Sequence, residues 1–147
     1  MDNDLRFKKF VTGDDMAFTL EALLNAEGIV YLNNYFSYDY YIRDLPNDKS
    51  ITNNVNVRLL DELMEAYIYC RKKTEGFSKE VQTVSLNPHL LHWMHTWKTS
   101  PFTKEENRLL LKKVNKLKKI HKGDLKTRML MSSMTTAIET AIYTARE

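Results

Sequence analysis

Apolar residues recur every three or four positions along most of the chain, which is the spacing of one buried face of an α-helix. Asparagine, aspartate or threonine stands before several of these stretches, where its side chain can cap a helix. We therefore expect a mainly α-helical fold of about five helices. The predicted helices cover residues 14–28, 57–73, 87–98, 103–122 and 124–143.

Capping signals mark the helix boundaries in the second half of the chain. Thr103 and Glu106 have the spacing of a capping box, so a helix is predicted to begin there. Asp124 is the predicted cap of the last helix. Pro88 follows an asparagine and is read as a first-turn proline, because its fixed φ suits that position. Residues 78–86 alternate weakly between apolar and polar positions and are predicted to form a short strand.

The most β-like part of the chain lies between residues 35 and 42, where aromatic and polar side chains alternate. Two asparagines just before it can form a tight turn to the apolar stretch upstream. The sequence therefore predicts a small β-hairpin at residues 29–42. An aromatic helix is the alternative, since Leu32, Phe36 and Tyr40 recur at every fourth position.

Length and composition predict one domain that spans residues 1–147. Its 43% apolar and 28% charged residues are near globular averages. A single cysteine, Cys70, excludes an internal disulfide framework and a thiolate zinc cage, and its helical position predicts a buried, inert thiol. The acidic N-terminus and the lack of a long apolar run favour a cytoplasmic or other intracellular location, with no membrane partner.

Charge is divided unequally along the chain. Residues 1–76 carry a net charge of −4 and residues 77–147 carry +7, and residues 104–128 alone contain ten basic and three acidic side chains. This asymmetry indicates a polyanionic partner or an acidic half that docks on a basic half, within one molecule or between two. The sequence leaves both interpretations open.

On the predicted helix 103–122, most of the basic side chains fall on one side and the apolar ones lie opposite. Such a row can neutralise phosphates without reading a base sequence. The remaining candidates follow at the start of the next helix. The predicted nucleic-acid contacts on these two helices are Lys104, Arg108, Lys112, Lys116, Lys119, Lys122, Lys126 and Arg128.

Two aromatic residues of the predicted hairpin complete this candidate surface. If one face of the hairpin is buried, Tyr35 and Tyr41 lie on the other face. Exposed tyrosines act as interface anchors and can also stack on unpaired bases. We therefore include both in the predicted nucleic-acid site.

Three histidines form the main group of candidate metal ligands. His89, His92 and His95 stand three residues apart on the predicted helix 87–98. Each step of three rotates the side chain by about −60°, so the first and third imidazoles diverge by about 120°. We therefore expect a partly exposed histidine row rather than a metal site, with Trp93 and Trp97 buried on the opposite face.

These features lead to three hypotheses about function. The leading one is a non-enzymatic binding protein that engages nucleic acid, or a nucleoprotein complex, through residues 104–128. The alternative is a protein interaction or assembly module, whose charged halves and exposed aromatics capture a protein partner or a second copy. The third is a small metal-dependent hydrolase that uses the histidine row. No cofactor is expected, because the sequence has no glycine-rich phosphate loop.

Overall fold

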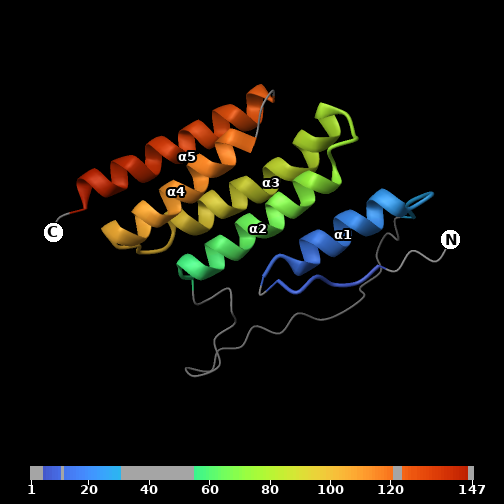
Figure 1. Cartoon of the computed structure of the whole chain (residues 1–147), viewed down its shortest axis with the longest axis horizontal. Coiled ribbons are helices and arrows are strands. Elements are labelled where there is room, and N and C mark those ends of the chain that lie inside the picture. Colours follow the sequence, from blue (N-terminus) through green and yellow to red (C-terminus); the bar gives the residue numbers. More distant parts are fainter. Residues whose placement is uncertain (1–4, 11, 31–54, 121–123, 146–147) are drawn as a thin grey trace, which may run out of the picture.

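Burial of one apolar face per helix produces a mainly α-helical fold, as the sequence predicts. The computed structural model of the chain describes residues 5–10, 12–30, 55–120 and 124–145. The five helices in these ranges are α1 (Asp14–Asn25), α2 (Val57–Lys73), α3 (Lys79–Lys98), α4 (Lys104–Ile120) and α5 (Leu125–Thr144) (Figure 1).

The predicted caps of α4 and α5 are confirmed. The Thr103 hydroxyl accepts a hydrogen bond from the Glu106 backbone N–H at 3.2 Å, and the Glu106 carboxylate accepts one from the Thr103 N–H at 2.8 Å. Asp124 accepts a hydrogen bond from the Lys126 N–H at 3.0 Å. These side chains satisfy backbone donors that have no partner within the helix, so both helices begin where the sequence predicts.

The predicted strand at residues 78–86 is wrong, because this segment is the first half of α3. Ser78 caps the helix by accepting a hydrogen bond from the Val81 N–H, and Pro88 lies inside the helix rather than at its start. The weak alternation has a physical cause, since α3 carries apolar side chains on its outer side as well as its inner side. Helical periodicity is therefore faint in the sequence.

The predicted β-hairpin at residues 29–42 receives no support. The described residues contain no strand, and Ile29 and Val30 are exposed and have no regular structure. Residues 31–42 lie outside the described ranges. The two described residues of this segment therefore give no sign of a strand.

The start of α1 depends on a glycine. Gly13 has a φ of 80°, in the left-handed region that other L-residues rarely adopt. A Cβ at this position would lie 2.8 Å from the Cβ of Ala66 on α2. Gly13 therefore lets α1 approach α2 closely. The helix ends at Asn25, slightly before the predicted end at residue 28.

The helices form two antiparallel pairs that pack on each other (Figure 1). α2 pairs with α3 and α4 pairs with α5, while α2 also contacts α4 and α3 contacts α5. Hydrogen bonds from Thr83 to Asp124 and from Thr127 to Asn87 join the starts of α3 and α5, which run in the same direction. α1 lies beside α2. Within the described residues, no helix combines the length and apolar character that a bilayer crossing needs.

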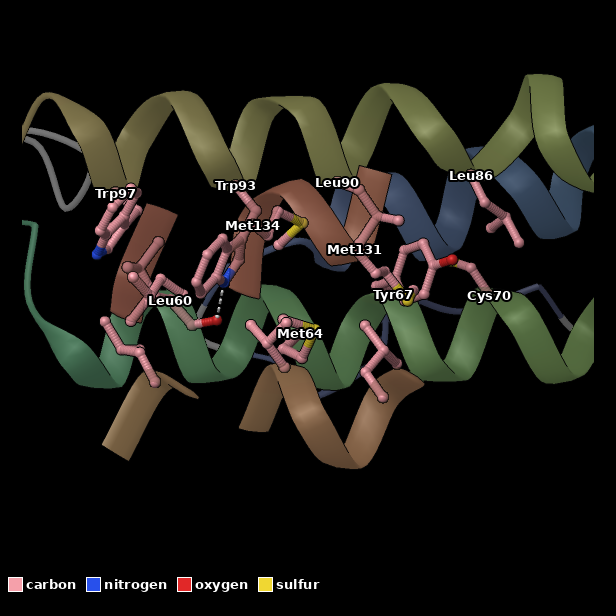
Figure 2. Close-up of a cluster of buried hydrophobic side chains, with 14 of the residues drawn as sticks. Leu60, Met64, Tyr67, Cys70, Leu86, Leu90, Trp93, Trp97, Met131 and Met134 are labelled. Atoms are coloured by element: carbon pink, nitrogen blue, oxygen red, sulfur yellow. Dashed lines mark hydrogen bonds between the residues drawn. The ribbon is translucent and has the colours of Figure 1, made fainter. Parts of the chain in front are cut away.

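One cluster of buried side chains from all five helices forms the core. Figure 2 shows Trp93 of α3 pointing toward α2, where its indole N–H donates a hydrogen bond to the Leu60 carbonyl at 2.8 Å. Trp97 similarly donates to the buried side chain of Asn107 on α4 at 2.8 Å. Both indoles are thus buried and each indole N–H has a hydrogen-bond acceptor, which confirms the predicted buried tryptophan pair.

Candidate nucleic-acid interface

α4 combines a core-facing side with the highest positive charge of any helix. Its seventeen residues include seven basic and two acidic side chains. Asn107, Leu110, Val114 and Leu117 are buried against the other helices. Since these anchors fix the rotation of the helix, the direction of its basic side chains is also fixed.

Four basic residues of α4 are exposed on the side away from the core, and we call them the α4 ridge: Arg108, Lys112, Lys116 and Lys119. They fall within about 80° of one another around the helix. At a rise of 1.5 Å per residue they extend over about 16 Å along its axis. The ridge therefore has the length of several nucleotide steps along a nucleic-acid backbone.

The other predicted basic contacts lie around this ridge. Lys104, in the first turn of α4, is half-buried. Lys126 and Arg128 are exposed near the start of α5, at the same end of the bundle as the end of α4 (Figure 1). Lys122, Tyr35 and Tyr41 lie outside the described residues. The structure thus brings seven of the ten predicted contacts to α4 and the adjoining turns of α5.

Lys113, next to the ridge, has a different environment. Its ammonium group lies 2.7 Å from Asp61 on α2. The hydrogen bond to Asp61 raises the pKa of Lys113, and Glu65 of the same helix adds to this effect. One lysine of the basic half is therefore neutralised by the acidic half within the same molecule.

The ridge lysines lack such partners. Lys112, Lys116 and Lys119 form no ion pair with any acidic residue in the described ranges. Arg108 is 3.1 Å from Glu105, one turn earlier, but both side chains are more than half exposed. An exposed pair of this kind contributes little free energy and exchanges readily for another anion. The α4 ridge consequently presents its charge to solvent.

The histidine row does not assemble a metal site among the described residues, where no three His, Cys, Asp or Glu side chains converge. His92 and His95 are exposed. His89 is half-buried in a groove of about 470 Å³ that α1, α2 and α3 line, and burial lowers its pKa, with a further contribution from His92. At physiological pH, His89 is therefore a neutral side chain that lines the groove.

The lone thiol lies in the core, as predicted. Cys70 is fully buried, and this burial raises its pKa to about 11. Because only the thiolate is a good nucleophile, a protonated and enclosed thiol is chemically inert at neutral pH.

Two features of this surface have no signal in the sequence. The pairing of Lys113 with Asp61 depends on how α2 and α4 pack, whereas helical periodicity places Asp61 on a solvated acidic face. The groove beside His89 likewise arises from three helices distant in the chain.

Comparison with protein-family models, curated proteins and solved structures gives no match to this chain.

Proposed function

We propose that this chain is a non-enzymatic binding protein that engages nucleic acid, alone or in a nucleoprotein complex, through the α4 ridge. One observation carries the proposal: Lys112, Lys116 and Lys119 point away from the core on a rigid helix and have no described acidic partner, whereas the adjacent Lys113 is paired. The outer surface of α4 therefore carries three lysines without a described acidic partner, next to one lysine, Lys113, whose charge Asp61 neutralises.

The chemistry of the ridge favours phosphate groups as ligands. Lysine ammonium groups on flexible stems contact phosphates as point charges, and each contact releases a condensed counterion. Such contacts fix the position of a protein on a nucleic acid without reading bases. Lys126 and Arg128 extend the positive surface beyond the end of α4. We therefore propose binding that depends strongly on salt and weakly on sequence.

Protein interaction or assembly is the second candidate function. The ion pair between Lys113 and Asp61, at 2.7 Å, favours it because acidic and basic halves are complementary at this point. The same complementarity between molecules would capture an acidic protein on the ridge. In that case the ridge residues are the same, and the partner is a protein surface rich in carboxylates.

Two variants of neighbouring residues test the proposed function. Replacement of Lys112, Lys116 and Lys119 together by glutamine removes three ridge charges, and Lys113→Gln removes one charge that is already paired. We expect the triple variant to weaken binding of random-sequence DNA and RNA. Its salt slope on duplex DNA should fall by about 0.9 for each phosphate that a ridge lysine no longer neutralises. Lys113→Gln should retain both the affinity and the slope of the wild type. Fluorescence anisotropy with labelled oligonucleotides measures both quantities.

Three outcomes of this experiment are informative. A drop in affinity confined to the triple variant supports the α4 ridge as the nucleic-acid site. Equal affinity in both variants and the wild type contradicts it. If the wild type binds neither DNA nor RNA at low salt, but binds an acidic polypeptide in a way the triple variant does not, the second candidate replaces the first.

A further inference from the structure

The side of the bundle formed by α3 and α5 is almost free of charge. Residues 81–97 of α3 contain no Asp, Glu, Lys or Arg, and residues 129–144 of α5 contain only Glu139. By contrast, α4 carries a net charge of +5, and α2 carries seven charged residues. Since α2 packs on α4 and α3 on α5, charged and uncharged helices occupy opposite sides of the bundle.

Apolar side chains are exposed along this uncharged side. On α3, Val84 is 75% exposed and Leu91 is 50% exposed, and Val81 and Pro88 lie on the same outer stripe. Met129 of α5 is 62% exposed. An uncharged helix face with large exposed apolar groups typically marks an interaction surface.

The exposed stripes of the two helices belong to one surface. Around α3, the residues that bond to α5, Thr83 and Asn87, lie between the buried stripe and the outer stripe. On α5, Ala141 lines a cavity with Trp97 and Lys98 of α3 and Asn107 of α4, and Ala137 stands one turn earlier on the same side. We call this surface the α3/α5 face. It consists of Val81, Val84, Pro88, Leu91, Met129, Ser133, Ala137 and Thr140.

We infer that the α3/α5 face is the contact surface of a symmetric homodimer. A second copy is the occupant that the charge distribution favours, because the middle of this surface carries no Asp, Glu, Lys or Arg and meets itself without repulsion, while Glu80, Lys98 and Lys126 lie toward its ends. In such a pairing the basic ridges of both copies lie on α4, away from the contact. Pairing through α4 would bring like charges together.

Charge at the two ends of α3 fits an antiparallel pairing. Glu80 and Lys98 are both exposed and stand eighteen residues apart, which is five turns, so they share one side of the helix. A two-fold axis near the middle of α3 would place Glu80 of each copy opposite Lys98 of the other. These two rim contacts are complementary in sign and set the direction of the pairing.

The area of the face meets the requirement of a specific dimer. From Glu80 to Lys98 the face is about 27 Å long, and two packed helices present a width of about 20 Å. Each copy would therefore cover about 540 Å², or about 1,100 Å² in total, which clears the roughly 1,000 Å² expected of a specific interface.

Sedimentation equilibrium of the full chain tests the dimer. We expect a concentration-dependent dimer that higher salt leaves intact or strengthens, because the contact is mainly apolar and its exposed rim charges contribute little to its free energy. Leu91→Glu should raise the dimer dissociation constant by about tenfold or more, since each substitution places two carboxylates at the contact. Leu109→Glu is the matched control, because Leu109 is 52% exposed but lies on α4.

Second variants keep the test decisive. If circular dichroism shows that Leu91→Glu loses helix, Val84→Glu at the more exposed position takes its place. Leu91→Cys should form a disulfide-linked dimer under mild oxidation, because Leu91 lies near the proposed two-fold axis and Cys70 is buried. A wild type that stays monomeric at all concentrations overturns the inference. So does a dimer that salt dissociates, or one that Leu109→Glu weakens as much as Leu91→Glu.

Discussion

Glu21 on α1 is a buried carboxylate that three groups from other segments hold in place. Its oxygens lie 2.7 Å from Lys73 Nζ and 3.3 Å from Lys8 Nζ, and the Tyr69 hydroxyl donates a hydrogen bond to it. Burial alone would raise the pKa of Glu21, but hydrogen bonds from Lys73, Tyr69 and Lys8 outweigh it and bring the pKa to about 2. The cluster therefore fastens the N-terminal segment and α1 to α2.

The lowered pKa of Glu21 makes this cluster sensitive to acid. Because the folded pKa lies below the ordinary value of 4.5, ionised Glu21 stabilises the fold above about pH 4.5, and this contribution disappears as the pH falls toward 2. Glu21→Gln should lower the free energy of unfolding by about 2 kcal/mol at neutral pH. Urea unfolding across this pH range should show the difference between variant and wild type shrinking in acid. A difference that stays constant would contradict the role of the charge.

At the scale of helices, the sequence predicts an element well where its two sides differ in polarity. α2 and α4 bury a narrow apolar stripe and expose charge, so their periodicity is clear. α3 buries Leu86, Leu90, Trp93 and Trp97 but exposes Val84 and Leu91 on the opposite side. With apolar residues on both sides and a proline in the middle, sequence patterning divides this helix into a strand and a shorter helix.

Replacement of Pro88 tests whether α3 is continuous. Proline in a helix interior lacks the N–H that would bond to the carbonyl four residues earlier, here that of Val84. Pro88→Ala restores this donor at an exposed position and should raise the free energy of unfolding by about 1–2 kcal/mol. Urea unfolding monitored by circular dichroism, at a protein concentration too low for self-association, measures it. A destabilised variant would indicate that the chain is not regular helix through residue 88.

For the whole molecule, the sequence predicts which residues are charged but not which of these charges are already paired with an opposite charge in the fold. Periodicity along α4 is enough to place Lys112, Lys116 and Lys119 on one outer side. The pairing of Lys113 with Asp61, by contrast, requires the packing of α2 on α4. The separation of charged helices from uncharged ones is also a property of the packing order. The opposite net charges of the two chain halves do not indicate this separation, because the uncharged helix α3 and the basic helix α4 both belong to the basic half.

The most direct measurement of the central claim is the salt dependence of nucleic-acid binding by the wild-type chain. If the α4 ridge binds phosphates, the logarithm of the association constant for duplex DNA should fall linearly with the logarithm of salt concentration. With three or four ridge contacts we predict a slope of about −3, and a decrease in affinity of about 60-fold between 50 and 200 mM salt. A slope near zero, or no binding at the lower salt concentration, would contradict the claim.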